Sequence, residues 1–220
     1  MNSVFWALVR KDVYLMRGFM VAAIGAGLLA VVLMRFGRIG FAVGGILFLT
    51  ANVASGIFIP MYSLLTERKD RSRAFALSLP ISGARHELSK LMSGYLSYGI
   101  PWFVLTAIAV LVFLLRPEER GMVVYALVLQ FFVLAIFSFV LAALFIVPSE
   151  AFSGVVILFS NIGFSLFMVA LNQPDIAGPL RGPEFVWTPF ALWMLSGELL
   201  VVVVSIAFAI LVASRKRDYI

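Results

Sequence analysis

Cysteine is absent from this sequence of 220 residues, and charged residues are scarce at 13%. Without cysteine, the chain has no disulfide bonds, thiolate metal sites or cysteine nucleophile. The charged fraction is about half that of an ordinary soluble domain. Since no polar stretch is long enough to fold as a separate soluble domain, we expect residues 1–220 to form a single membrane domain.

The sequence contains a single histidine, His86. It lies in a polar segment, and we expect it at the surface near Glu87. Intramembrane serine proteases and metalloproteases need histidines that this chain cannot place in a span. A phosphate-binding loop, Gly-x-x-x-x-Gly-Lys-Ser/Thr, is also missing. We therefore expect no enzymatic activity, no metal site and no cofactor in this chain.

Hydrophobic residues make up 63% of the sequence and form long uncharged stretches. The stretches are near or above the roughly 20 residues that a helix needs to cross a bilayer. Lipid offers no hydrogen-bond partner to an open strand edge, and the stretches lack the alternation of barrel strands. We therefore predict an all-α integral membrane fold with six transmembrane helices. The predicted spans are 18–34, 39–66, 91–115, 121–149, 151–174 and 185–214, the last interrupted by Glu198.

Three shorter features refine this prediction. Residues 3–16 mix apolar side chains with basic and acidic ones, which favours an amino-terminal interfacial helix on the membrane surface. Four prolines, Pro174, Pro179, Pro183 and Pro189, predict that the segment from Gln173 to Pro189 contains no regular helix. Gly40 and Gly44 lie four residues apart in the second span, a spacing that favours close packing against another helix.

The distribution of lysine and arginine predicts the orientation of the spans. With a cytoplasmic amino terminus, twelve basic residues fall on the cytoplasmic side and five on the outer side. Cytoplasmic loops carry such an excess, so we expect both termini in the cytoplasm. The same bias accounts for the net charge of +6, and we expect no nucleic-acid partner. The twelve are Arg10, Lys11, Arg17, Arg68, Lys69, Arg71, Arg73, Arg85, Lys90, Arg215, Lys216 and Arg217.

The longest predicted cytoplasmic segment covers residues 67–90, between the second and third spans. Its first charges end at Arg73, an apolar set follows, and Pro80 and Gly83 predict a turn before a second polar helical stretch. This pattern is typical of a short surface helix followed by re-entry into the membrane. Exposed apolar side chains favour a cytoplasmic protein partner. Contact with the membrane surface, or a solvated loop that only fixes topology, are the alternatives.

Short motifs occur at the boundaries of the predicted spans. They are Leu8, Lys11, Asp12 and Arg17 before the first span, Glu67-Arg68 after the second, Leu79-Pro80-Ile81-Ser82 in the connecting segment, Lys90 before the third and Pro101 within it. Together with the six-span topology, these motifs resemble the permease subunits of type 2 ATP-binding-cassette exporters. Members of that family are predominantly bacterial and are paired with separate ATPases. The resemblance covers the whole chain in topology, but only these segments in motif.

This resemblance implies a partner and a way of working. In the family, a coupling helix after the second span docks on a cytoplasmic ATPase, and residues 68–82 correspond to it here. ATP and magnesium would bind the ATPase, not this chain. The working unit contains two permeases, which implies a homodimer or a heterodimer with a second permease, surrounded by the lipids of the bacterial inner membrane. The residues implied in docking are Glu67, Arg68, Arg71, Arg73, Phe75, Leu77, Leu79 and Pro80.

Three polar residues within the predicted spans are candidates for a translocation path. The resemblance implies that the second and fifth spans line that path, which points to Asn52 and Asn161. Such residues also hydrogen-bond between helices for purely structural reasons. Glu198 is the only acid that interrupts a span, and an ionisable group in a membrane is a functional hypothesis by default. A protonated structural acid, or one that reaches outer water, is the alternative reading.

The leading hypothesis is therefore an exporter permease driven by a separate ATPase. Two other functions stay open at this point: an ATP-independent channel or secondary transporter, and a membrane scaffold without transport. The substrate does not follow from these residues.

The apolar set of the connecting segment yields a direct test of docking. We predict that Leu79→Asp weakens association with the ATPase or its coupling, because a charge replaces an apolar contact, while membrane insertion is unchanged. Copurification of the ATPase and the membrane-inserted yield measure the two effects. Unchanged association and unchanged coupling would contradict the docking role.

Overall fold

The fold is entirely helical throughout the part of the chain that the structure describes, residues 2–66, 82–146 and 149–215 of a computed structural model. Six of its helices are long and apolar enough to cross a membrane, which confirms the predicted all-α membrane architecture. The elements are α1 (Asn2–Leu33), α2 (Gly37–Met61), a π-helical turn η1 (Tyr62–Thr66), α5 (Gly83–Leu114), a 3₁₀ turn η2 (Pro117–Glu119), α6 (Met122–Ile146), α7 (Glu150–Leu171), α8 (Pro174–Leu180) and α9 (Pro189–Arg215).

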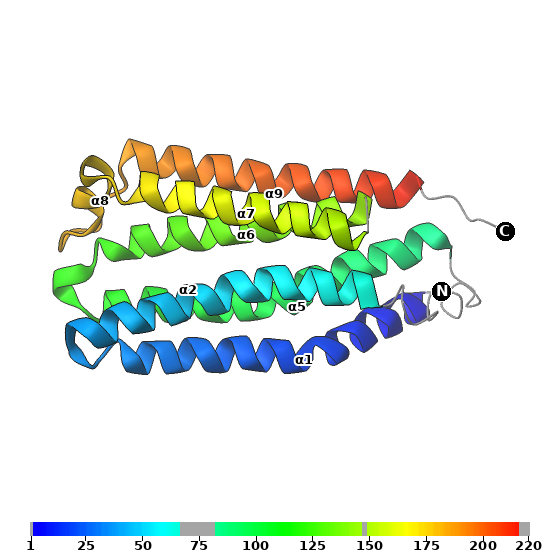
Figure 1. Ribbon diagram of the computed structural model, residues 1–220, viewed down its shortest axis with the longest axis horizontal. Coiled ribbons are helices and arrows are strands. Elements are labelled where there is room, and N and C mark those ends of the chain that lie inside the picture. Colours follow the sequence, from blue (N-terminus) through cyan, green and yellow to red (C-terminus); the bar gives the residue numbers. More distant parts are fainter. Residues whose placement is uncertain (1, 67–81, 147–148, 216–220) are drawn as a thin grey trace.

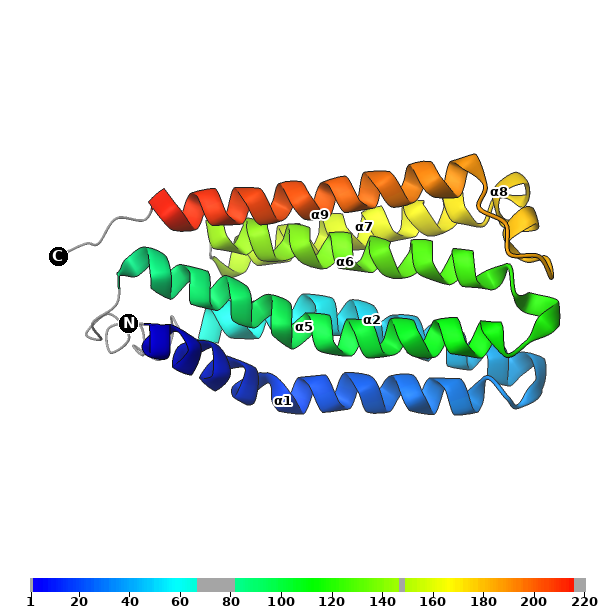
Figure 2. The same cartoon turned by 180° about the vertical axis from the view of Figure 1, so that it is seen from behind.

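Helix α6 lies at the centre of the bundle (Figures 1 and 2). It packs against α2 and α5 on one side and against α7 and α9 on the other, while α1 packs along α2 and α5. The sequence of α6 is apolar all around its circumference, as expected for a helix that is enclosed by others. Its fully buried side chains include Val124, Val128, Phe137, Leu141, Leu144 and Phe145.

Helix α1 is longer than the predicted first span. The expected interfacial helix over residues 3–16 is not a separate element, because it forms the first half of this continuous helix. Its buried side chains recur about every fourth residue, which is one face of an α-helix, and this face continues into the predicted span. The burial of that face explains the continuity. The residues are Leu8, Asp12, Met16, Met20 and Ala23. The position of 3–16 on a membrane surface stays a prediction.

The proline-rich segment between Gln173 and Pro189 contains a short helix, α8, so the expectation of no regular helix there was wrong for Pro174–Leu180. Pro174 is at the start of α8, where a missing N–H removes no helical hydrogen bond. Pro179 comes only at the end of the helix. The two prolines therefore limit the length of α8 without preventing it.

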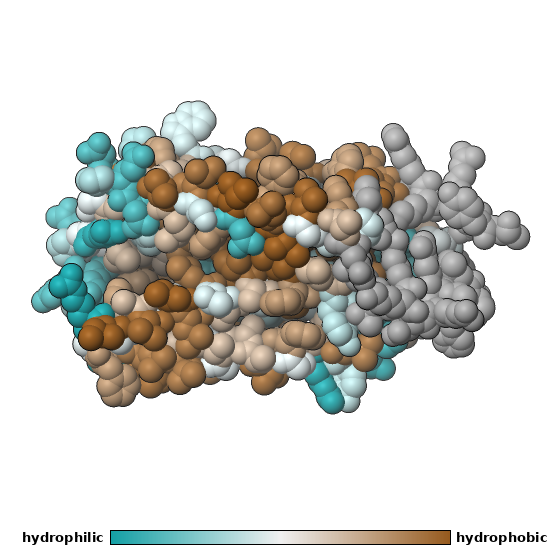
Figure 3. All heavy atoms as spheres, viewed as in Figure 1, coloured by the Kyte–Doolittle hydropathy of each residue, from teal (hydrophilic) through white to brown (hydrophobic). Residues whose placement is uncertain are grey.

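The two ends of the bundle differ. The start of α1, the start of α5 and the end of α9 lie at one end, and α8 lies at the other (Figure 1). In Figure 3, brown apolar side chains cover the middle of the visible face, and teal polar ones gather at the end that carries α8. Because the number of spans is even, the start of α1 and the end of α9 lie on the same side of the membrane. The identity of that side as the cytoplasm stays a prediction.

Gly44 lies at a close contact between α1 and α2, as its spacing from Gly40 predicted. A Cβ atom added to Gly44 would lie 2.5 Å from the carbonyl oxygen of Ala30 and 2.9 Å from the backbone nitrogen of Met34. Backbone atoms cannot move aside as a flexible side chain can. Only glycine therefore allows the two helices to approach this closely at this point.

This contact yields a matched pair of substitutions. We predict that Gly44→Leu lowers the free energy of unfolding by about 1–3 kcal/mol or more, because the added side chain overlaps the α1 backbone. Gly45→Leu is the control, since a Cβ atom at the neighbouring Gly45 meets no atom within 4 Å. Thermal unfolding of the purified protein in detergent measures both. Equal stability of the two variants would contradict the close contact.

Candidate functional site

The eight residues implied in ATPase docking, from Glu67 to Pro80, lie outside the described residues. The structure shows the helices that this segment connects. Helix α2 ends in the π-helical turn Tyr62–Thr66, and α5 begins at Gly83. The segment is therefore joined directly to the end of η1 and to the start of α5.

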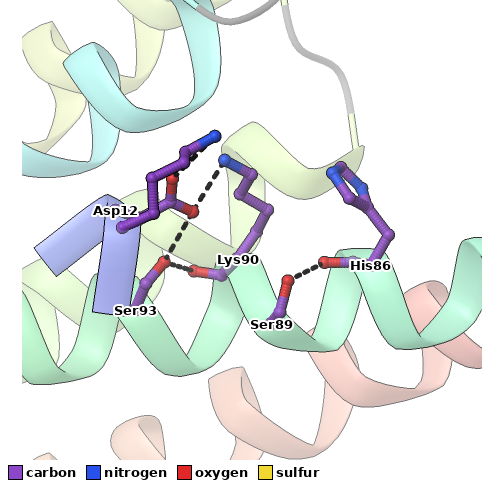
Figure 4. A network of polar contacts seen from close by, with 6 residues as sticks. Asp12, His86, Ser89, Lys90 and Ser93 are labelled. Atoms are coloured by element: carbon purple, nitrogen blue, oxygen red, sulfur yellow. Dashed lines mark hydrogen bonds and ion pairs between the residues drawn. The ribbon is translucent and has the colours of Figure 1, made fainter. Parts of the chain in front are cut away.

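A buried ion pair joins the start of α5 to α1 (Figure 4). The Nζ atom of Lys90 lies 2.7 Å from Oδ2 of Asp12, and each side chain is only 5% exposed. Figure 4 shows the two side chains pointing toward each other from neighbouring helices. The pair thus fixes the register of α1 on α5 at the end of the bundle where α5 begins.

Neighbouring polar groups surround the pair. The hydroxyl of Ser93 donates to the backbone oxygen of Lys90 at 3.0 Å and lies 3.5 Å from Oδ2 of Asp12. Ser89, one turn earlier, donates to the backbone oxygen of His86 at 2.6 Å. Lys11 lies 3.6 Å from the other oxygen of Asp12, but its side chain is 49% exposed. Asp12 therefore has one buried and one solvated cationic neighbour.

His86 is 4% exposed, and the expectation that it lies at the surface was wrong. Helix α5 begins at Gly83, eight residues before the predicted start of the third span at 91. Its first turns are covered by packing, so Glu87 is buried as well, at 9% exposure. The polar start of α5 is part of the bundle and not a solvated connector.

The ion pair acts more as a positioning contact than as a source of net stability. Removing two charges from water is costly, and their attraction inside a protein roughly offsets that cost. Removing one partner is different, because the other charge stays buried after it has lost its nearest opposite charge. The arrangement therefore penalises any state in which α1 and α5 separate at this point.

The three candidates for the translocation path face different surroundings. Asn52 in α2 is fully buried, and its Nδ2 donates to the backbone oxygen of Phe48 at 3.4 Å. Asn161 in α7 is exposed on the outside of the single chain, and its Nδ2 donates to the backbone oxygen of Ile157 at 2.9 Å. These two residues do not line one cavity with Glu198.

Glu198 in α9 is 6% exposed and lines a cavity of about 580 Å³ between α6, α7 and α9, which we call the Glu198 cavity. Its walls are almost entirely apolar. Ser160, the residue beside Asn161 in α7, lines the cavity where Asn161 does not. The translocation role of Asn52, Asn161 and Glu198 stays a prediction.

The pairing of Asp12 with Lys90 was missed from the sequence, although both residues belong to the quoted motifs. The sequence feature that could have revealed this pairing is the spacing of the polar residues in α5. His86 and Lys90 are four residues apart, as are Ser89 and Ser93, so the polar groups lie close together on the helix. A polar patch at a predicted helix start needs a partner. Asp12 is the only acid among the first sixty-six residues.

A family model for ABC-2 family transporter proteins matches residues 7–215. No curated protein and no solved structure matches the chain. The match reaches into all six spans and includes both partners of the buried ion pair. It confirms the resemblance that the boundary motifs indicated.

Separate substitutions test the ion pair. We predict that Asp12→Asn or Lys90→Met lowers the free energy of unfolding by about 3–5 kcal/mol, because each removes the nearest opposite charge from a buried charged group. The double variant Asp12→Lys with Lys90→Asp should recover part of the loss. Denaturant titration of the purified protein measures these effects.

Lys11→Met is the matched control for Asp12. It removes the half-exposed cation near the same carboxylate, and we expect a change of at most about 1 kcal/mol. A loss in the Lys11 variant equal to that of Lys90→Met would contradict the distinct role of the buried pair.

Proposed function

Because this chain belongs to the ABC-2 transporter family, as the permease subunit of an ATP-binding-cassette transporter, we propose that it exports its substrate, driven by a separate cytoplasmic ATPase. The match over residues 7–215 carries this proposal. The absence of a phosphate-binding loop from the sequence supports a partner that binds ATP and magnesium. The proposed location is a bacterial inner membrane, with both termini in the cytoplasm.

The ATPase docks, in this proposal, on the segment around residues 68–82. This segment is the direct connection between α2 and α5. The Asp12–Lys90 pair lies two turns into α5 and joins that helix to α1. If the ATPase displaces this segment, α2 and α5 move with it because they are covalently joined to it. Helix α1 then follows α5 because the ion pair connects the two helices. Three helices would then move as one unit.

The path lies, in this proposal, between two permeases. The exposure of Asn161 on α7 supports this arrangement, because polar side chains of membrane helices usually face protein or water and not lipid. Helix α7 packs only against α6 and α8 to any extent within the described part of the chain. Its remaining surface is free to meet a second copy or a related permease.

Coexpression tests the partner directly. We predict that the tagged chain copurifies with its cognate ATPase and stimulates ATP hydrolysis in the membrane. Failure of every candidate ATPase of the source organism to associate would contradict the proposal. ATPase-independent transport in vesicles would indicate a secondary transporter, and association without transport would indicate a scaffold.

The ion pair supplies a sharper version of this test. Lys90→Met should retain the ATPase but lower substrate-stimulated hydrolysis several-fold, because α1 no longer follows α5. Lys11→Met is the control and should behave as the unmodified chain. The charge-swapped double variant should restore stimulation. Unchanged substrate-stimulated ATP hydrolysis in a correctly folded Lys90→Met variant would contradict the proposal that the ion pair transmits movement from α5 to α1.

A further inference from the structure

The Glu198 cavity has the size and composition of a small-molecule site. Its volume of about 580 Å³ is within the usual range for ligand pockets, roughly 300–1,000 Å³. It lies at mid-length of the bundle, since Glu198 is the tenth of the 27 residues of α9. Helices α7 and α9 both pack on α6 but not closely on each other within the described residues. The cavity occupies the gap between them.

Glu198 is a buried acid that the described residues leave without a partner. Neither of its carboxylate oxygens accepts a hydrogen bond from these residues. Asp12, by contrast, is a buried acid with Lys90 at 2.7 Å. An unpaired carboxylate in a membrane protein is costly and needs a compensating cation or donor. A positively charged group that also donates a hydrogen bond would satisfy both needs.

The walls of the cavity suit an organic cation. Four phenylalanines line it, Phe132 and Phe139 from α6 and Phe159 and Phe167 from α7. Aromatic rings attract cations through their faces and bury apolar groups at the same time. Ser160 donates its hydroxyl hydrogen to the backbone oxygen of Val156 at 2.8 Å. The lone pairs of that hydroxyl oxygen are left to accept a hydrogen bond from a ligand.

An inorganic ion fits less well. Divalent cations require several oxygen ligands, and Glu198 is the only acidic residue that lines this cavity. No group of three or more potential metal-ligating side chains occurs anywhere in the described part of the chain. A single carboxylate among aromatic rings matches one positive charge on a largely apolar body.

We propose that the Glu198 cavity binds a lipophilic monocation, with an ammonium group at the carboxylate of Glu198 and an apolar body against the phenylalanine rings. The bound molecule belongs to the substrate class of the transporter, and to that extent the inference rests on the proposed function. Entry from the bilayer is consistent with the apolar body, because such molecules concentrate in membranes.

Binding to the purified chain without any ATPase tests this proposal. Equilibrium dialysis in detergent, with empty micelles as the blank, compares naphthylmethylamine, a cation at neutral pH, with the uncharged naphthylmethanol. We expect Glu198→Gln to weaken binding of the amine about tenfold or more, since hydrogen bonds to charged groups are worth at least that factor. Binding of the alcohol should change little.

Substitutions at two glycines of α7 test the shape of the cavity independently of the charge of Glu198. A Cβ atom at Gly163 or at Gly154 meets no atom within 4 Å, but only Gly163 lines the cavity. Gly163→Leu should therefore fill the cavity and abolish saturable binding of both ligands. Gly154→Leu is the matched control on the same helix and should bind both as the unmodified chain does.

Three outcomes would overturn the proposal. They are equal binding of amine and alcohol by the unmodified chain, equal amine binding by Glu198→Gln, and no saturable binding of either ligand. The last result is expected if a second copy of the chain covers the cavity. Because no ATPase is present in the assay, any of these outcomes leaves ATPase association as a separate result, and a failure of ATPase association leaves the binding result intact.

Discussion

Charges within the helical packing of a membrane protein must be compensated, and the Asp12–Lys90 pair is where this constraint organises the bundle. The two side chains come from α1 and α5, which are separated by α2 and by the segment proposed to meet the ATPase. Removing either charge is costly, because the other stays buried after it has lost its nearest opposite charge. The pair therefore makes the position of α1 depend on that of α5, and both depend on what happens to the segment between α2 and α5.

Asp12 and Glu198, two buried acids of the bundle, have opposite surroundings. Asp12 is fully compensated by Lys90, with Ser93 beside it, and its role is to hold helices together. Glu198 lies in an apolar cavity and lacks a partner among the described residues. A paired charge holds helices together, whereas an unpaired one in a membrane helix is a candidate functional site.

Helix α6 divides these two roles in space. On one side lie α1, α2 and α5, which contain the ion pair and adjoin the proposed docking segment, and on the other lie α7 and α9, which contain the Glu198 cavity (Figure 1). Because α6 packs against both sides, a buried apolar core connects α5 with the helices that form the cavity. Stacking of Tyr98 in α5 on Phe137 in α6, with ring centroids 4.1 Å apart, is one such contact.

The sequence by itself determined that the chain is helical and crosses the membrane six times, because lipid leaves an apolar run of this length no other way to satisfy its backbone. It also determined that Gly44 permits close packing and that Glu198 is exceptional, since both follow from residue type and spacing. Only the tertiary structure decided that Lys90 pairs with Asp12, that His86 is buried, and that Ser160 and not Asn161 lines the cavity with Glu198. These facts depend on which faces of distant helices meet, and helix rotation and register are set by packing across the whole bundle, not by local sequence.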